Sequence, residues 1–478
     1  MELLDSFITA INNVLWSYVL IFLLVGLGLY FTLRTHFVQL RMLPEMVRLL
    51  TEGAGSKTRG REISTFQAFC VSTASRVGVG NIAGIAIAIV LGGPGAVFWM
   101  WCIAFIGSAT GFVESTLAQI YKLPRSLGLF HGGPAYYIKN ALNQPNVARL
   151  FAVLISVTFG LIYNSVQSNT IAIAVENSFS VPRIVTAVVL AILTALVIFG
   201  GLHRIAKVAE VLVPIMAVAY LLVAVLVILF HISELPGVLA LIIHDAFTPQ
   251  AAVGGGMGGA VLVGIKRGLF SNEAGEGSIP NAAATAVTSH PVKQGLVQAF
   301  GVYVDTWLVC TATAFIVLLS GQYEIGGSLT GIALAQESLA VNFGSLAPAF
   351  LSLMVFLFAF SSIVGNYYYG EVNVPFFGSN QKFWLTFFRM LVICMVFFGS
   401  IAELSLVWDM ADLFMGLLCM TNLYAITRLA KYACAALNDY VRQKRKGIAE
   451  PTFNPSILPD EHSIYAWGME KKNPVPKK

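Results

Sequence analysis

The chain alternates between long apolar runs and short polar connections over most of its length. A helix needs about 20 apolar residues to cross the hydrocarbon core of a bilayer. Counting such runs predicts an all-α polytopic membrane protein with eleven transmembrane helices. The runs lie near residues 14–34, 65–91, 95–121, 148–172, 183–200, 207–230, 254–285, 295–320, 345–370, 383–402 and 405–427.

The composition agrees with a membrane location. Hydrophobic residues make up 57% of the 478 residues and charged residues only 11%, whereas a soluble domain carries about 25% charged residues. The net charge of +5 is small, and the basic residues cluster in loops. We therefore expect a lipid bilayer around the protein and no nucleic-acid partner. The six cysteines lack metal-site spacing and are expected to pack as small apolar residues.

Basic residues are concentrated in alternate loops. They follow the first, third and fifth predicted spans and fill the C-terminal tail, with Arg183 as the one exception. Because cytoplasmic loops carry an excess of Lys and Arg, this bias predicts an outside N-terminus and a cytoplasmic C-terminus. Residues from about 436 to 478 contain five prolines and are predicted to form a mobile cytoplasmic tail. The loops without Lys or Arg are 92–94, 231–253, 321–344 and 403–404.

Two predicted spans contain residues that do not suit a continuous helix. The second holds Gly78 and Gly80 close to Arg76, and the seventh contains nine glycines and the polar run 270–278. Irregular backbone is tolerated in a membrane only where protein or a watery cavity covers it. Free amides at such a break attract a carboxylate, and free carbonyls attract Na⁺ or an ammonium group. A zwitterionic amino acid together with a cation satisfies both.

The two breaks lie five spans apart, so each opens a set of five spans. An odd number of spans in each set inverts one set relative to the other, which is the layout of an inverted-repeat secondary transporter. The alternative is that the glycines only allow close helix packing. Two breaks in corresponding places, each with polar residues, favour the transporter.

Four stretches resemble the alanine or glycine:cation symporter family (sodium:alanine symporters). They read GVGNIAG at 78–84, GGPGAVFWMW at 92–101, GGP at 132–134 and KRGLFSNEAGEGS at 266–278. The resemblance covers about residues 15–430. It implies a leucine-transporter-type fold, with one extra helix before two inverted five-helix repeats. It also implies Na⁺-coupled uptake of small neutral amino acids, with H⁺ as the less common driver. The division implied is 1–61 for the extra helix and a basic loop, 62–230 and 231–430 for the repeats, and 431–478 for the tail.

The resemblance also implies a substrate site and a Na⁺ site at the first break. Hydroxyl and carbonyl oxygens are hard ligands of the kind that Na⁺ prefers. For the serines of the Na⁺ site, the alternative is ordinary hydrogen bonding within their own helix. No cofactor other than the coupling ion is implied. The implied substrate residues are Ser75, Gly78, Gly80, Gln167 and Phe270, and the implied Na⁺ ligands are the carbonyls of Ala74 and Val77 and the hydroxyls of Ser361 and Ser362.

The sequence departs from the family pattern at three positions. Val79 and Arg76 stand where small or hydroxyl residues are common. Asn366 stands where members with a tight alanine pocket carry Trp. An amide in that place enlarges the pocket and adds a donor and an acceptor. Glutamine and asparagine therefore join the expected substrates, and the alternative is that Asn366 only packs.

Arg76 lies in the middle of the second predicted span. A charge at that depth is costly and requires a partner. We expect an ion pair with an acidic residue such as Glu114 or Asp305. The alternative is that Arg76 replaces a second Na⁺ beside the substrate carboxylate.

Four charges surround the polar run of the seventh span: Lys266, Arg267, Glu273 and Glu276. Their spacing permits an ion-pair cluster near the cytoplasmic end of that span. The cluster is expected to form part of an inner gate, and a plain interfacial salt bridge is the alternative.

Other functional classes fit the sequence less well. The seven histidines show no metal-enzyme spacing, so we do not expect an enzyme. A channel requires a repeated filter or charged rings, and a scaffold gains nothing from broken helices. The sequence therefore predicts a Na⁺-coupled importer of a small neutral amino acid in a bacterial cytoplasmic membrane. It does not specify the oligomeric state, and a monomer is compatible with it.

Overall fold

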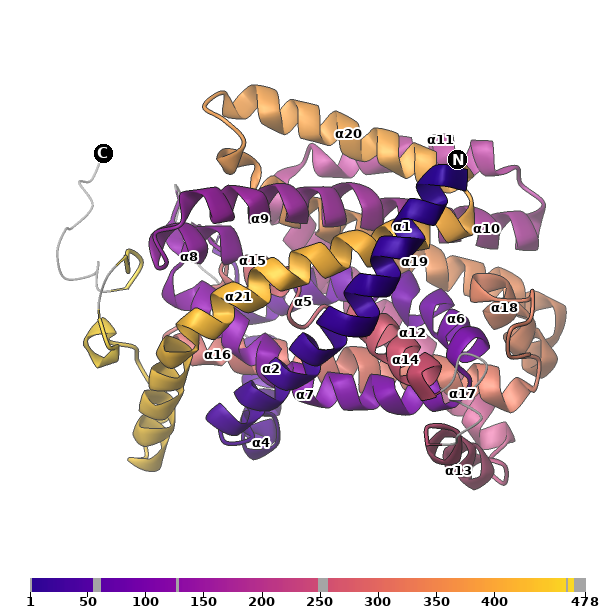
Figure 1. Cartoon of the computed structure of the whole chain (residues 1–478), viewed down its shortest axis with the longest axis horizontal. Coiled ribbons are helices and arrows are strands. Elements are labelled where there is room, and N and C mark those ends of the chain that lie inside the picture. Colours follow the sequence, from indigo (N-terminus) through magenta and orange to yellow (C-terminus); the bar gives the residue numbers. More distant parts are fainter. Residues whose placement is uncertain (1, 55–61, 126–128, 248–256, 461–462, 468–478) are drawn as a thin grey trace.

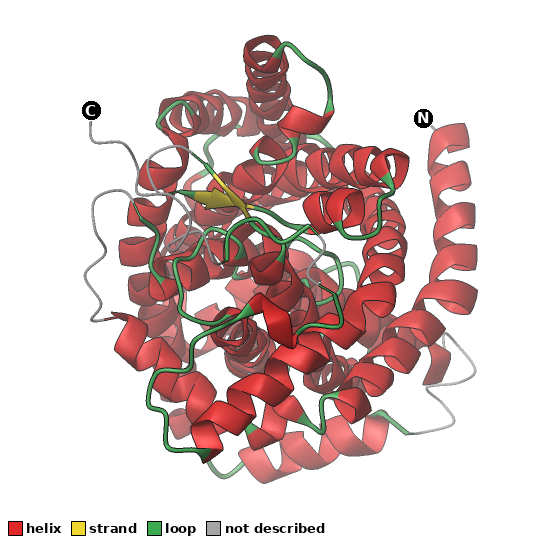
Figure 2. Ribbon diagram, turned by 90° about the vertical axis from the view of Figure 1, so that its left-hand side faces the viewer, coloured by secondary structure: helices red, strands yellow, loops and turns green. Residues whose placement is uncertain are grey.

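The structure, a computed structural model, describes residues 2–54, 62–125, 129–247, 257–460 and 463–467 (Figure 1). This part of the chain is nearly all helical. Its one sheet pairs two antiparallel strands of two residues each, β1 (Leu123–Pro124) and β2 (Phe130–His131) (Figure 2). The predicted all-α class is confirmed.

Eight helices among the described residues are long and apolar enough to cross a membrane. Three of the predicted spans are not among them: the two with breaks and α11 (Arg183–Ile198), which has 16 residues. The polytopic membrane architecture is therefore confirmed. The eight are Ile8–Arg34, Gly95–Ile120, Pro145–Phe179, Ile205–Phe230, Pro291–Ser320, Gly331–Phe376, Gln381–Ile401 and Leu404–Arg445.

The second predicted span is interrupted, as its glycines indicated. Helix α5 (Thr65–Arg76) begins with a capping box of Ser64 and Gln67 and ends at the first break. A 3₁₀ turn, η2 (Val79–Asn81), follows, and α6 (Ala83–Gly92) completes the segment.

The seventh predicted span is interrupted too. Helix α14 (Met257–Asn272) and the short α15 (Ile279–Ala283) flank an irregular run at 273–278. Glu273, Gly275 and Gly277 have φ angles of 58°, 100° and 80°, and three left-handed residues so close together stop a helix. The predicted start of this span, with glycines 254–256, lies outside the described residues.

The remaining helices complete a bundle whose long members run along the horizontal direction of Figure 1. In chain order the first half contains α1 (Glu2–Val14), η1 (Leu15–Leu20), α2 (Ile21–Arg34), α3 (Val38–Arg41), α4 (Leu43–Ala54), α7 (Gly95–Ile120), α8 (Pro134–Asn140), α9 (Pro145–Val157), η4 (Thr158–Tyr163), α10 (Asn164–Phe179), α11 (Arg183–Ile198) and α12 (Gly201–Phe230). The second half contains α13 (Leu235–Asp245), α16 (Pro291–Tyr303), η6 (Val304–Cys310), α17 (Thr311–Ser320), α18 (Gly331–Phe343), η7 (Gly344–Leu346), α19 (Ala347–Glu371), η8 (Val374–Phe376), α20 (Gln381–Ile401), α21 (Leu404–Arg445) and η9 (Pro455–Ile457).

The interrupted segments lie inside this bundle. Helix α5 packs against α12 and α19, and α14 packs against α6 and α7. Helices α4 and α8 and the end of α21 gather at one end of the molecule, whereas α13 and α18 lie at the other (Figure 1). The end with α4 and α8 is the one that carries the basic loops, and we call it the basic end.

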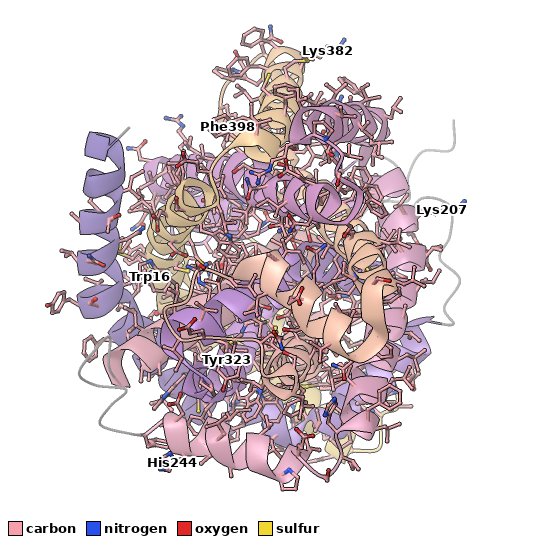
Figure 3. The ribbon with its side chains drawn as sticks, turned by 90° about the vertical axis from the view of Figure 1, so that its right-hand side faces the viewer. Trp16, Lys207, His244, Tyr323, Lys382 and Phe398 are labelled. Carbon is pink, nitrogen blue, oxygen red and sulfur yellow. The ribbon has the colours of Figure 1, made fainter. Side chains whose placement is uncertain are left out.

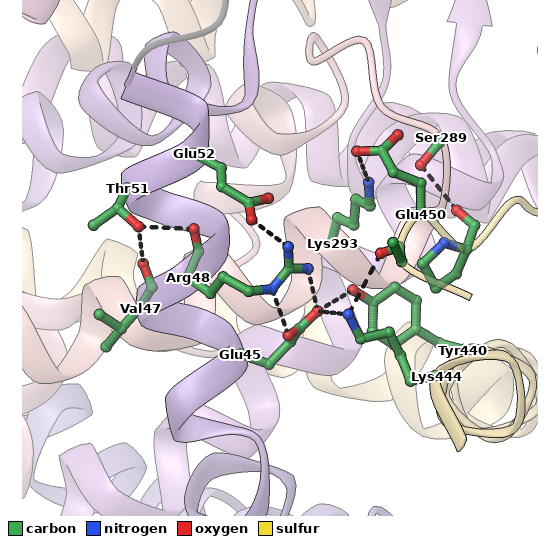
Figure 4. Close-up of polar contacts among 12 residues, drawn as sticks. Glu45, Val47, Arg48, Thr51, Glu52, Ser289, Lys293, Tyr440, Lys444 and Glu450 are labelled. Carbon is green, nitrogen blue, oxygen red and sulfur yellow. Dashed lines mark hydrogen bonds and ion pairs between the residues drawn. The ribbon is translucent and has the colours of Figure 1, made fainter. Parts of the chain in front are cut away.

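The predicted mobile tail is wrong for its described residues, 436–460 and 463–467. Helix α21 continues to Arg445, and the buried Tyr440 donates a hydrogen bond of 2.5 Å to Glu45 of α4 (Figure 4). Farther on, the amide of Phe453 donates to the Ser289 carbonyl (3.0 Å). The prediction rested on the proline and charge content and gave no weight to three aromatic residues of this tail. These residues, Tyr440, Phe453 and Trp467, pack against the loops of the basic end.

Lys122 lies beneath this tail and is only 2% exposed. Its ammonium group donates to the carbonyl of Ala286 (2.9 Å) and lies 4.8 Å from the centre of the Trp467 ring. Burial lowers the pKa of Lys122 to about 7. The unfolded lysine, with a pKa of about 10.4, binds more protons than the folded one between about pH 7 and pH 10, so stability rises with pH in this window.

We therefore expect the Tm of the detergent-purified protein to rise from pH 7 to pH 9 more steeply than that of Lys122→Met. The difference in slope isolates this lysine from the other titrating groups. Equal slopes for the two proteins would show that Lys122 keeps its charge beneath the tail.

Candidate substrate and cation site

The two breaks face each other in the centre of the bundle. The ring of Phe270, near the end of α14, lies against Gly80, where an added Cβ atom would be 2.8 Å from Phe270 Cδ1. The Ser75 hydroxyl at the end of α5 donates to Glu273 Oε1 at 2.7 Å. Residues far apart in the sequence thus form one buried cluster.

Side chains satisfy the free backbone groups of the first break. The Gly78 amide donates to Asn81 Oδ1 and the Val79 amide donates to Gln167 Oε1, both at 3.0 Å. Irregular backbone at membrane depth persists only when its polar groups find partners inside the protein. Gln167 of α10 therefore holds the amide that this break leaves free.

The second break is held in the same way from α7 and α21. The Gly275 amide donates to Glu114 Oε1 (3.3 Å), and Asn422 Nδ2 donates to Glu114 Oε2 (2.8 Å) and to the Gly275 carbonyl (2.9 Å). Tyr137 in turn donates to Asn422 Oδ1 (2.7 Å). This network fixes the shape of the run 273–278.

All the predicted substrate residues lie together at the first break. Ser75 Oγ is 2.6 Å from Asn366 Oδ1, and Gln167 faces Gly78 and Val79. Asn366 is 1% exposed, and its Nδ2 atom has no partner among the described residues. A buried unpaired donor costs about 1–3 kcal/mol, which a ligand oxygen at this position would offset.

Three of the four predicted Na⁺ ligands also come together. The hydroxyls of Ser362 and Ser361 lie 2.9 Å and 3.4 Å from the carbonyl oxygen of Ala74. Both hydroxyls donate to the Phe358 carbonyl of their own helix as well, so the alternative of local bonding describes part of the geometry. Val77, the fourth residue, directly follows α5, where the chain leaves the helix. The donor set, hard oxygens from two elements, fits Na⁺.

The expected ion pair of Arg76 is wrong. The guanidinium is 2% exposed and donates to Gln298 Oε1 (2.8 Å) and Ser72 Oγ (3.0 Å), and it pairs with neither Glu114 nor Asp305. A helix contact explains the difference: Gly301 of α16 lets the guanidinium pack against its backbone, where an added Cβ atom would meet Arg76 Nη2 at 2.5 Å. Neutral oxygens thus solvate this charge.

The expected ion-pair cluster of the seventh span is wrong as well. Lys266 and Arg267 pair with Asp412 of α21, at 3.3 Å and 2.5 Å, and with neither Glu273 nor Glu276. They precede the break and lie on the part of α14 that packs against α6 and the start of α7. The pair therefore lies on the side of the break away from the basic end.

Two aromatic residues beside the site were missed by sequence reasoning. Phe270 packs between Tyr163 and Trp408, each with its ring centre 4.7 Å away. Trp408 also stacks on Arg267 (4.6 Å), and Tyr163 donates to Glu276 Oε2 (3.1 Å). Both lie within or beside apolar runs that contain many other aromatic residues, so no local pattern distinguished them.

Four buried carboxyl groups surround the breaks: Glu114, Glu273, Glu276 and Asp305. Asp305 joins both broken segments, because Asn81 Nδ2 donates to its Oδ1 and Ser271 Oγ to its Oδ2, each at 2.6 Å. Within the described part of the chain, none of the four forms an ion pair. Each of the four accepts at least one hydrogen bond from a side chain or backbone amide of a neighbouring segment.

The fold and the site define a polytopic membrane transporter with its polar cluster at two helix breaks. The family comparison gives the particular class. The sequence model of the sodium:alanine symporter family matches residues 1–455, and the chain belongs to this family. The family is one of sodium-coupled amino-acid symporters, as the sequence motifs predicted.

Several relatives carry related names. The chain is 53% identical over 466 residues to the probable sodium/glutamine symporter GlnT of Bacillus subtilis, covering 98% of this chain and 96% of that protein. It is 48% identical to the amino-acid carrier protein AlsT of the same organism (98% and 100% covered). It is 37% identical to the sodium/alanine symporter AgcS of Methanococcus maripaludis (89% and 94% covered).

A solved structure shares the fold at low sequence identity. A mutant of the manganese transporter of Eremococcus coleocola superposes with a TM-score of 0.51 at 12% identity, covering 78% of this chain and 81% of that one. This likeness concerns the arrangement of helices alone.

Proposed function

We propose that this protein imports a small neutral amino acid together with Na⁺. We propose eleven transmembrane helices for it, of which the first is an extra helix and the other ten form two inverted repeats of five. The repeats are 62–230 and 231–430, and the protein lies in a bacterial cytoplasmic membrane with its N-terminus outside. The observation that carries the proposal is the meeting of two helix breaks, with Gln167, Phe270 and Asn366 around them. The interrupted helices and α11 supply the three spans beyond the eight long ones.

The substrate carboxylate binds at the amide of Val79. Gln167 Oε1 accepts from this amide at 3.0 Å, and a carboxylate oxygen offers the same acceptor with a full charge. Na⁺ binds between α5 and α19, at the oxygens of Ala74, Ser361 and Ser362. Because both ligands use the end of α5, binding of one orders the backbone that the other needs, which couples the two free energies of binding.

Asn366 directs the choice of substrate toward a side chain with an amide. Its Nδ2 donor is free within the described structure, and its Oδ1 atom accepts a hydrogen bond from the Ser75 hydroxyl. The carboxamide of glutamine or asparagine presents both an oxygen and an NH₂ group to such a pair. The name of the Bacillus subtilis relative, a probable sodium/glutamine symporter, agrees with this choice.

Uptake by the purified protein in proteoliposomes tests the proposal. We expect labelled glutamine and alanine to accumulate under an inward Na⁺ gradient and not when K⁺ replaces Na⁺. Unlabelled amino acids compete in the order of their affinity. Facilitated equilibration without any dependence on Na⁺ would contradict coupled transport.

A second candidate is H⁺-coupled symport by the same site. It is favoured by the four buried carboxyl groups around the breaks, which no ion pair neutralises in the described residues. A proton carried on such a group performs the role of a coupling cation. Accumulation driven by a pH gradient in Na⁺-free vesicles would establish this candidate in place of the first.

We expect Asn366→Trp to lower the uptake of glutamine relative to alanine. The indole fills the space of the amide and removes its donor and acceptor. Losing a hydrogen bond to a buried group costs about 1–3 kcal/mol, or roughly five- to 150-fold. Competition uptake on both proteins measures the ratio, and an unchanged ratio would mean that Asn366 only packs.

A further inference from the structure

Two adjoining cavities lie between α9 and α20 near the basic end. One, of about 370 Å³, is lined mainly by apolar side chains of η8, α9, η4 and α20, among them Val153, Leu161 and Phe387. The other, also about 370 Å³, is lined by Lys139 and by the connection from α19 to α20. Arg149 lines both cavities, as does Phe376.

These cavities face the edge of the bundle. Helix α20 runs along the outside of the molecule above α9 in Figure 1, and the labelled Lys382 and Phe398 mark its two ends in Figure 3. Both helices belong to segments long and apolar enough to cross a membrane. An acyl chain of the surrounding bilayer therefore has access to the apolar cavity.

Two cations at this site lack an acidic partner. Lys139 and Arg149 are exposed, and neither forms an ion pair within the described part of the chain. Lys139 lies 5.7 Å from the centre of the Phe376 ring. Among the described residues, the lining of the two cavities contains no Asp or Glu, and the nearby Glu371 pairs with Arg389 instead (3.7 Å).

We propose that this site binds one anionic phospholipid, with an acyl chain in the cavity between α9 and α20 and its phosphate between Lys139 and Arg149. Basic pockets between transmembrane helices recognise anionic headgroups in this way. A zwitterionic lipid fills the apolar cavity but brings its own cation to the headgroup. A soluble phosphate satisfies the two cations and leaves the cavity empty.

Native mass spectrometry of the detergent-purified full chain tests the proposal with three probes: dioleoyl phosphatidylglycerol, dioleoyl phosphatidylcholine and inorganic phosphate. We expect the wild type to retain one phosphatidylglycerol, and to retain neither phosphatidylcholine nor phosphate at the same concentration. For Lys139→Ala/Arg149→Ala we expect retention about 30-fold weaker, because each cation near a membrane surface contributes roughly fivefold. Arg149→Lys keeps the charge and should retain the lipid.

A matched control removes two other exposed cations of loops near the basic end. Arg34 and Arg41 are the last residues of α2 and α3, and the neighbouring α2 and α4 lie across the bundle from α20 (Figure 1). Arg34→Ala/Arg41→Ala should therefore retain phosphatidylglycerol like the wild type. Equal retention by the Lys139/Arg149 variant would overturn the proposal. Equal retention of phosphatidylcholine by the wild type would overturn the anionic preference. The test does not use transport, so its outcome is independent of the proposed substrate.

Discussion

Replacing Gly78 by alanine is expected to reduce uptake by about 10- to 100-fold while the protein still inserts and purifies. An added Cβ atom would overlap Ser362 Oγ and lie 2.9 Å from Gln167 Oε1. One of these neighbours belongs to the proposed Na⁺ site and the other to the proposed substrate site. Overpacking of a buried contact costs about 1–3 kcal/mol, and here it displaces ligands of both kinds.

Initial rates at varied Na⁺ and amino-acid concentrations measure the effect, and we expect the KM values for both ligands to rise. Gly26→Ala is the matched control, because no atom lies within 4 Å of the position of its Cβ. If Gly78→Ala kept the wild-type uptake rates, the first break would not form part of the binding site. Loss of uptake in both variants would point to a general intolerance of the fold.

Asp412→Asn is expected to destabilise the folded protein by about 3–5 kcal/mol, the usual effect of removing one partner from a buried ion pair. Arg267 and Asp412 are 5% and 3% exposed, and Lys266 has the same carboxylate as its partner. Without it, two cations remain beside the Trp408 and Trp16 rings with no carboxylate to balance them. Thermal unfolding in detergent should show a lower Tm.

Two further variants test whether the lost stability comes from leaving buried charges without a partner. In Asp412→Asn/Arg267→Met the second change removes one uncompensated charge, so part of the lost stability should return. Glu176→Gln breaks the half-exposed Arg183–Glu176 pair, and pairs near the surface contribute only about 0–1 kcal/mol. If Asp412→Asn and Glu176→Gln lowered the Tm equally, the buried ion pair would stabilise the fold no more than the Arg183–Glu176 pair does.

Much of the site could be predicted from the sequence because it lies at two local irregularities. A break in a transmembrane helix requires residues of unusual type, such as Gly78 and Gly277, and these are visible against an apolar background. The family motifs added Gln167, Phe270 and the two serines. Once the breaks were placed, the residues beside them had to lie near one another.

The charge partners could not be predicted in this way. Arg267 pairs with Asp412, and Arg76 is solvated by Gln298, more than a hundred residues away in each case. The choice among several buried carboxylates depends on which helix faces which after packing. The sequence spacing suggested near neighbours such as Glu273, which instead bonds to Ser75 and Ser278.

By itself, the sequence determined that the chain crosses a membrane repeatedly, where two of its helices break and to which family it belongs. Apolar run length, glycine content and local motifs are properties of consecutive residues, so they need no folded structure. Only the tertiary structure decided that Tyr163 and Trp408 enclose Phe270, that the tail packs on the loops, and that Arg149 lines an apolar cavity beside one lined by Lys139. Each of these depends on contacts between separate helices, whose free energy is set by shape and burial and not by local composition.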